Sequence, residues 1–253
     1  MPLHEFVKSG CLAVVSASRK GTEEVCTRTA AFTRRLNGHS ALAVAGVLGP
    51  AMWVIGDFTS GFATSHYSLI VNSISSLALT PIGWLATIGF LALGLFVEVF
   101  AAGLLFNIKG RRFFYFGVGI FVILGFALLL IGAFRTDPVN AVRTLEGKIH
   151  GMTARIAFSI FPVALLCLIP SIKHDPNWQR FYRYTLVTII LAVVLLVINK
   201  IFQEGSGWFG LEERLLVWNM ILWVEVAGIN MFFLSLKREP KTPFFTNVNS
   251  AVR

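Results

Sequence analysis

Serine, aspartate and histidine side chains of the types used in hydrolysis lie near the ends of long apolar stretches. Ser75 and Ser76 offer hydroxyl nucleophiles, Asp137 offers a carboxylate, and His150 offers an imidazole base. Ester and amide hydrolysis uses this combination when the fold brings the groups within hydrogen-bonding distance. The sequence contains neither a Gly-x-Ser-x-Gly nucleophile motif nor a glycine-rich phosphate loop. These four residues are therefore candidate catalytic groups, and their types alone do not fix a reaction.

A zinc site is an alternative that His66, Asp137 and His150 leave open. Histidine nitrogens and carboxylate oxygens bind zinc, and some membrane hydrolases of the ceramidase and adiponectin-receptor type combine such ligands with a serine. The paired-histidine helix motif of those enzymes is missing here. The three cysteines are an odd number without paired spacing, which is not the pattern of a disulfide framework or a structural metal site. We predict no metal and no cofactor.

Four ionisable residues lie inside the apolar stretches, namely Asp57, Glu98, Arg155 and Glu225. A charge near the centre of a bilayer costs about 2.5–3.5 kcal/mol on insertion scales, so each of them needs a partner or water. A helical rise of about 1.5 Å per residue puts Asp57 and Arg155 at similar depths, and we predict an ion pair between them. Glu98 is predicted to extend toward the basic segment 109–112.

The last apolar stretch carries polar residues on two helical faces. Glu212 and Asn219 share one face, and Arg214 and Glu225 share another. Lipid cannot satisfy such groups, so both faces are expected to contact protein. The faces are typical of interhelical hydrogen bonds or of the lining of a polar cavity.

These residues, with those of the preceding connections, predict a polar cluster at the extracytoplasmic ends of the spans. Its arginines are suited to gripping a phosphate group. The candidate ligand-binding residues are Asp57, Trp84, Arg155, Glu212, Glu213 and Arg214, and the intramembrane polar residues are Glu98, Asn219 and Glu225. For Trp84, the position favours an anchoring role in the aromatic belt at the membrane surface over ligand binding.

The composition shows which elements must position these residues. The chain of 253 residues is 55% hydrophobic and 14% charged, and its mean hydropathy is +0.72, whereas soluble domains carry about 25% charged residues. These values exclude a soluble enzyme, a disordered protein and a disulfide scaffold. We predict an all-α polytopic membrane protein with six transmembrane helices, each about 20 residues long. The predicted spans are 41–59, 82–106, 113–134, 151–172, 184–202 and 215–236.

The distribution of lysine and arginine predicts the orientation. Sixteen of the 22 basic residues lie in the two tails and in the second and fourth connections between spans, and five lie on the other side. Positive charge resists translocation, so both termini are predicted to be cytoplasmic. The net charge of +9 then reflects attraction to an anionic inner leaflet, and nucleic acid is not an expected partner. We expect a multi-pass protein of the cell membrane, of the prokaryotic plasma-membrane type, with lipids as partners.

Three domains follow from this pattern. Residues 1–40 form a basic tail that is expected to be poorly ordered and cytoplasmic, residues 41–236 form the membrane domain, and residues 237–253 form a second cytoplasmic tail. The connection 60–81 carries no formal charge but is rich in serine. It is expected to fold back along the membrane surface, where its serines would meet the other outer loops.

Several short motifs occur in a characteristic order between the spans. They are Gly46 to Pro50, Ser73-Ile74-Ser75-Ser76-Leu77 with Gly83-Trp84-Leu85, Thr136-Asp137-Pro138, His150-Gly151 and Glu213-Arg214-Leu215. In these motifs the stretch from Val44 to Leu236 resembles the bacterial and archaeal membrane proteins grouped as domain of unknown function 998. The resemblance implies a six-helix membrane fold and a shared outer polar site, and it implies no particular reaction.

Three functions remain open at this stage. The first is binding of a lipid or small amphiphile, or steadying of a membrane partner, through the outer polar cluster. The second is hydrolysis of a lipid at the outer leaflet by Ser75 or Ser76 with Asp137 and His150. The third is proton-coupled transport, suggested by Glu225 in the middle of the last span; the absence of a visible repeat argues against transport.

Overall fold

The computed structural model describes residues 38–138, 140–201 and 207–237, and within these ranges the chain is helical, without strands. Six long helices occur, α3 (Gly38–Ala63), α4 (Trp84–Asn107), α5 (Phe114–Ala133), α6 (Leu145–His174), α7 (Phe181–Ile201) and α8 (Phe209–Lys237). A short 3-10 helix, η2 (Ile74–Leu79), lies between α3 and α4. All six long helices are long and apolar enough to cross a membrane. The predicted all-α, six-span architecture is confirmed.

Some helices extend beyond the predicted spans. α6 starts at Leu145 and not at the predicted residue 151, because Thr144 caps it: the Thr144 hydroxyl accepts a hydrogen bond from the Gly147 amide at 3.1 Å. α8 starts at Phe209, so Arg214 lies more than one turn inside the helix and not before it. Of the two predicted tails, only residues 38–40 and residue 237 lie within the described ranges, as the two ends of the bundle.

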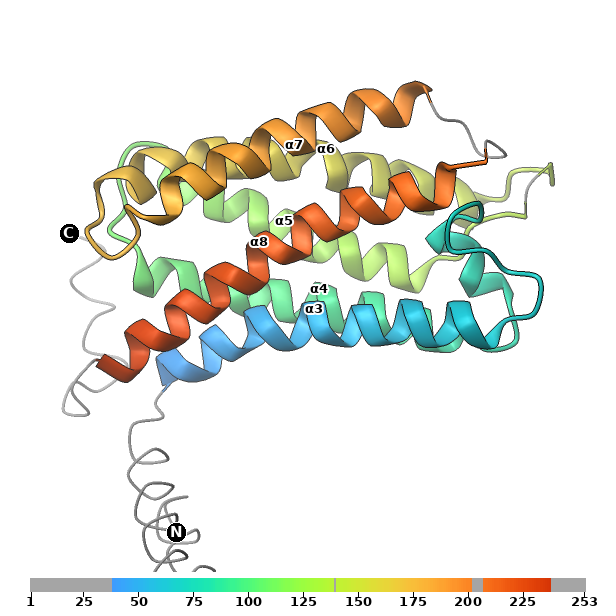
Figure 1. The fold of residues 1–253 in the computed structure, drawn as a ribbon, viewed down its shortest axis with the longest axis horizontal. Helices are drawn as coiled ribbons and strands as arrows, with labels where there is room; N and C mark the ends of the chain where they lie inside the picture. Colours follow the sequence, from blue (N-terminus) through green and yellow to red (C-terminus); the bar gives the residue numbers. More distant parts are fainter. Residues whose placement is uncertain (1–37, 139, 202–206, 238–253) are drawn as a thin grey trace, which may run out of the picture.

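The chain runs up and down through the bundle, with successive helices side by side (Figure 1). α8 then crosses back to lie against α3, which joins the last helix to the first. The α3–α4 connection, the start of α6 and the start of α8 lie at one end of the bundle, which we call the site end. α3 begins and α8 ends at the opposite, terminal end (Figure 1). The two ends of the bundle therefore lie on the same side, as an even number of crossings requires.

Close contact between α3 and α8 depends on two glycines. A Cβ atom on Gly228 of α8 would lie 3.0 Å from the backbone of Gly46 and from the Ala43 carbonyl oxygen. Farther along, Trp223 stacks on Phe121 with ring centroids 5.4 Å apart and meets Phe100 edge-on at 6.2 Å. All three rings are fully buried. Small residues and aromatic packing thus hold α8 against the rest of the bundle, as is typical where lipid supplies no hydrophobic driving force.

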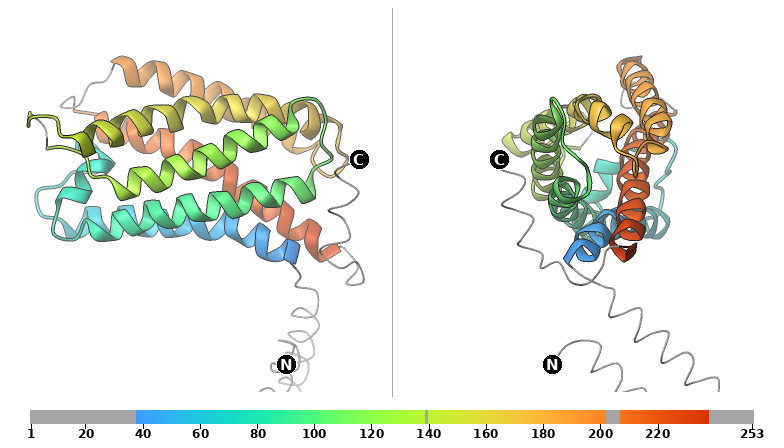
Figure 2. Two further views of the ribbon diagram at one scale, coloured as in Figure 1. Left: turned by 180° about the vertical axis from the view of Figure 1, so that it is seen from behind. Right: turned by 90° about the vertical axis from the view of Figure 1, so that its left-hand side faces the viewer.

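α7 lies at the edge of the bundle (Figure 2) and packs on α6 and α8. Its outer surface is apolar, and Val187 and Ile190 are about 60% exposed, at 61% and 62%. Polar contacts tie it to α8: the Asn219 amide donates to the Thr188 carbonyl at 3.1 Å, and the Asn199 amide donates to Glu212 at 2.6 Å. The polar face predicted for Glu212 and Asn219 therefore contacts protein.

Candidate functional site

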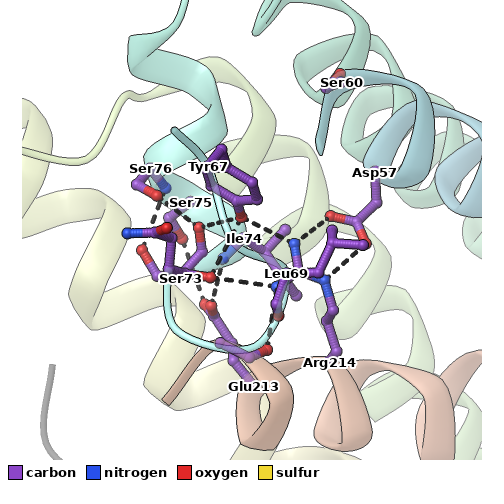
Figure 3. Close-up of polar contacts among 12 residues, drawn as sticks. Asp57, Ser60, Tyr67, Leu69, Ser73, Ile74, Ser75, Ser76, Glu213 and Arg214 are labelled. Atoms are coloured by element: carbon purple, nitrogen blue, oxygen red, sulfur yellow. Dashed lines mark hydrogen bonds and ion pairs between the residues drawn. The ribbon is translucent and has the colours of Figure 1, made fainter. Parts of the chain in front are cut away.

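A buried ion pair forms the centre of the site end (Figure 3). The Arg214 guanidinium of α8 donates to both carboxylate oxygens of Asp57 on α3, from Nε at 3.0 Å and from Nη2 at 2.9 Å. The two side chains are 4% and 1% exposed. Two parallel hydrogen bonds between a planar guanidinium and a carboxylate are the strongest form of this contact. We call Asp57, Arg214 and the adjoining Tyr67 the arginine clasp.

The same guanidinium fixes the connection between α3 and α4. Arg214 Nη1 donates to the carbonyl oxygens of Leu69 at 2.7 Å and Asn72 at 3.2 Å, and also to that of Gly210 at 3.1 Å. Nη2 also donates to the Tyr67 hydroxyl at 2.8 Å. Every guanidinium nitrogen therefore has an acceptor, which a buried arginine requires. One side chain of α8 thus determines the path of a connection that lies some 140 residues earlier in the chain.

Tyr67 links Arg214 to the residue that precedes η2. Its hydroxyl donates to the Ser73 carbonyl at 2.8 Å while it accepts from Arg214. Burial raises the pKa of Tyr67 to about 12, against the opposing effect of the Arg214 charge. Tyr67 is therefore a neutral phenol at physiological pH and keeps its proton for the Ser73 carbonyl.

The predicted ion pair between Asp57 and Arg155 is wrong. Asp57 binds Arg214, whereas Arg155 is exposed on α6. The helix that packs against α3 here is α8 and not α6, so a similar predicted depth did not make Arg155 the partner of Asp57. The actual start of α8 at Phe209 also brings Arg214 down to the level of Asp57, since five residues of helix span about 7.5 Å.

A serine–histidine pair lies next to the clasp. The Nε2 atom of His150 on α6 lies 2.9 Å from the Ser75 hydroxyl oxygen on η2. The Nδ1 atom lies 2.9 Å from the Phe134 carbonyl oxygen and 3.2 Å from that of Ile131, at the end of α5. Two of the four predicted catalytic residues, Ser75 and His150, are therefore within hydrogen-bonding distance. The histidine is 5% exposed and the serine is half-buried.

Glu213 holds the segment that carries Ser75 (Figure 3). Its Oε2 atom accepts from the Ile74 amide at 2.6 Å, and its Oε1 atom lies 3.4 Å from the Ser75 hydroxyl. The Ser76 hydroxyl makes a hydrogen bond within the same segment, because it donates to the Ser73 carbonyl at 2.7 Å. Of the two candidate serines, only Ser75 contacts the histidine.

Asp137 has a structural partner. Its carboxylate accepts from the Thr144 amide at 3.0 Å and from the Thr144 hydroxyl at 2.7 Å. A Cβ atom on Gly147 would collide with this carboxylate. Asp137, Thr144 and Gly147 therefore close the turn that begins α6 and places His150 more than one turn inside the helix.

Thr144→Ala is expected to lower the stability of the protein by about 1 kcal/mol, because the helix loses its N-cap hydroxyl and Asp137 loses one of its two hydrogen bonds to residue 144. The measurement is the thermal midpoint of the detergent-purified protein. Asp137→Ala should give a similar loss, since both changes break the same cap. A thermal midpoint for Asp137→Ala equal to that of the unaltered protein would show that the carboxylate is not needed for the cap.

A cavity of about 500 Å³ opens beside the serine–histidine pair. Its polar lining comes from η2, the α5–α6 connection, α6 and the start of α8. The lining includes Ser75, Asp137, Arg143, His150, Arg155 and Glu213. Arg143 and Arg155 are exposed, and among the described residues neither forms an ion pair. Two cationic side chains thus line the cavity without an ion pair, although the carboxylates of Asp137 and Glu213 belong to the same lining.

Other predicted residues lie elsewhere. Trp84 is 59% exposed at the start of α4, the position expected of a membrane-surface anchor. Glu98 lies against Gly125 and does not form the expected contact with the basic segment 109–112. The reason is that α5 packs closely on α4 at this glycine. Glu225 is half-buried in α8 and does not line the cavity.

The zinc alternative finds no support in the described part of the chain. Asp137 and His150 both line the cavity, but His66 is exposed on the α3–α4 connection and does not. Within residues 38–138, 140–201 and 207–237, no three His, Cys, Asp or Glu side chains gather in a way that could hold a metal ion.

Tyr67, Arg143 and Thr144 are the residues of the site that sequence reasoning missed. Thr144 followed by Gly147 and a long apolar stretch had the pattern of a helix start. Arg143 contributed to the sequence analysis only as one of the basic residues in its connection, and its spacing gave no sign of a cavity. Tyr67 gave no signal, because its role depends on a guanidinium from the last helix.

Comparison with known proteins gives a family and nothing narrower. Residues 47–230 match the family described as "Protein of unknown function (DUF998)". No curated protein and no solved structure gives a significant match. The matched range extends from α3 into α8 and contains the arginine clasp, the serine–histidine pair and the cavity.

Proposed function

Since the chain belongs to the DUF998 family of proteins of unknown function, we propose its function from the cavity itself: it binds an amphiphile through an anionic headgroup. The observation that carries this proposal is that Arg143 and Arg155 line a polar cavity and form no ion pair with a described residue, although Asp137 and Glu213 belong to the same lining. Guanidinium groups bind phosphate and carboxylate oxygens in pairs, and they do so more strongly than a neutral donor. The Thr136 hydroxyl adds a neutral donor to the same lining.

The surroundings of the cavity suit a ligand with acyl chains. Met152 and Ile156 flank Arg155 on α6 and are 54% and 43% exposed. A headgroup between the arginines would leave its chains beside these apolar side chains, along the outside of the bundle. The bundle is built from membrane-spanning helices, so lipid is the surrounding medium on that side.

We place the cavity on the extracytoplasmic side. Lys109, Arg111, Arg112 and Lys173 lie at the terminal end, opposite the cavity. Basic segments of this kind remain in the cytoplasm during insertion. The ligand would then come from the outer leaflet. Steadying of a membrane partner at the same end also stays a prediction.

The test is native mass spectrometry of the detergent-purified protein titrated with phosphatidylglycerol, phosphatidylcholine or inorganic phosphate. We expect phosphatidylglycerol to bind most strongly, and Arg155→Leu to weaken its binding about 10-fold, the effect of one charge-assisted hydrogen bond. Arg135→Leu is the matched control, because Arg135 is exposed at the same end but does not line the cavity.

Three outcomes decide the matter. Binding of inorganic phosphate as strong as that of the lipid would make the ligand a free anion. Equal binding of the two lipids, unchanged by either arginine variant, would contradict an anion-selective site. Equal losses in Arg135→Leu and Arg155→Leu would mean that net charge at this end, and not the cavity, attracts the lipid.

Hydrolysis of the bound amphiphile is a second candidate function, and one observation favours it. Ser75 and His150 lie 2.9 Å apart in the lining of the same cavity. A nucleophile hydrogen-bonded to a base beside a bound substrate is the minimal arrangement for acyl transfer.

A further inference from the structure

We infer that Ser75 is a covalent nucleophile, which accepts an acyl group from an ester-linked anionic amphiphile, with His150 as its general base. This inference rests on the proposed binding function for its substrate class. It deepens the second candidate function, because it commits to an acyl-serine intermediate and to an ester.

The contacts of His150 determine which ring nitrogen carries the proton. Both neighbours of Nδ1 are carbonyl oxygens, of Ile131 and Phe134, and a carbonyl oxygen can only accept a hydrogen bond. Nδ1 is therefore protonated, and in the neutral ring Nε2 carries a lone pair. The Ser75 hydroxyl, whose one proton could also go to Glu213 Oε1 at 3.4 Å, then has its shorter contact with the Nε2 lone pair, at 2.9 Å, and we assign its hydrogen bond to Nε2. This is the hydrogen bond that a nucleophile and its base make before reaction.

The end of α5 takes the place of the third group of a catalytic triad. In such triads a carboxylate holds the histidine in the correct tautomer and stabilises the imidazolium that forms. Here two carbonyl oxygens of the last helical turn accept from Nδ1, and the C-terminal end of a helix favours a nearby positive charge. The imidazolium is thus oriented and stabilised without a buried carboxylate on the Nδ1 side.

The position of Ser75 leaves its oxygen accessible. The serine is half-buried and lines the cavity, whereas the imidazole behind it is buried. Glu213 is a positioning residue: it holds the Ile74 amide at 2.6 Å and so fixes the first turn of η2. Ser76, one residue later, is absent from the lining and makes only local hydrogen bonds.

The proposed reaction has two steps. In the first, Ser75 Oγ forms a bond to the acyl carbon and its proton moves to His150 Nε2. The bond from that carbon to the alcohol oxygen breaks, and the alcohol leaves with the proton from Nε2. In the second step, water gives a proton to Nε2 and attacks the acyl-serine; a carboxylic acid leaves, and the Ser75 hydroxyl regains its proton.

The test uses a small uncharged alkyl fluorophosphonate on the full-length protein in detergent. The Ser75 oxygen displaces fluoride from phosphorus, and intact-mass measurement reports the adduct. We expect one adduct on Ser75, its loss in Ser75→Ala, and its retention in Ser76→Ala, the control for a neighbouring hydroxyl. His150→Gln should slow labelling about 100-fold or more, the contribution of a general base.

Absence of an adduct on the unaltered protein, or labelling of Ser75→Ala at the same rate, would overturn the inference. If His150→Gln does not fold, the two serine variants still decide it, because both keep the hydrogen bond from the Ile74 amide to Glu213 that holds η2. The uncharged probe needs no arginine, so labelling does not depend on the proposed headgroup binding. Loss of lipid binding with labelling intact would overturn the binding proposal alone, and the reverse result would overturn only the nucleophile.

Discussion

Arg214→Leu is expected to destabilise the protein by about 3–5 kcal/mol, the cost of removing one partner from a buried ion pair. Asp57 would remain as a buried carboxylate without its cation, and the carbonyl groups of Leu69 and Asn72 would each lose a hydrogen bond from the guanidinium. The thermal midpoint of the purified protein should fall by roughly 10 °C, or folded protein should not be recovered. Arg214→Lys should recover only part of the loss, because an ammonium group cannot make the two parallel bonds.

A double-mutant cycle separates the ion pair from the general cost of substitution. Asp57→Leu alone leaves a buried guanidinium unpaired, whereas Asp57→Leu combined with Arg214→Leu leaves neither charge. The double variant should therefore be more stable than the sum of the two single losses predicts. Arg155→Leu is the comparison for arginine at the same end, and its exposed position predicts an unchanged midpoint. Additive losses in the cycle would contradict the clasp.

Gly210→Ala is expected to lower stability by about 1–3 kcal/mol, the usual cost of overpacking. A Cβ atom at this position would collide with the backbone of Asn72. The first turn of α8 also binds the same connection through the Leu211 amide, which donates to the Ile70 carbonyl at 2.9 Å. The connection would have to move away from α8, and Ser75 with it.

This change should therefore lower two independent quantities, the thermal midpoint and the rate at which Ser75 reacts with the fluorophosphonate. Gly119→Ala is the matched control: Gly119 is exposed on α5, and a Cβ atom there would meet nothing within 4 Å. An unchanged midpoint in Gly210→Ala would mean that the connection has room to shift, and would contradict close packing at this point.

The sequence predicts which segments form the long helices, but it does not predict which helices pack against each other. Apolar length predicts each span, because a helix of about 20 residues crosses the hydrocarbon core whatever surrounds it. The partner of Asp57 depends on which helix lies beside α3, and that contact is made by α8 through small residues such as Gly46 and Gly228. Depth gives the position of a side chain along the membrane normal only. An ion pair also depends on which helices are neighbours.

The serine–histidine pair also could be predicted only in part from the sequence. Residue type selected both Ser75 and His150, but it gave Ser76 and Asp137 equal standing. What distinguishes them is local: Asp137 is occupied by the cap of α6, and Ser76 by the Ser73 carbonyl. Such contacts follow from the exact starts of α6 and η2, which hydropathy does not locate.

The arginine clasp joins one of the first parts of the bundle to be synthesised to its last helix. Asp57 and the connection 63–84 leave the ribosome well before Arg214, so their charge and carbonyl groups have no partner while α4 to α7 are being inserted. The site end therefore cannot form until α8 has been added to α3. Without α8, the Asp57 carboxylate on α3 would lack its guanidinium, and an unpaired charge is costly in a membrane-spanning helix.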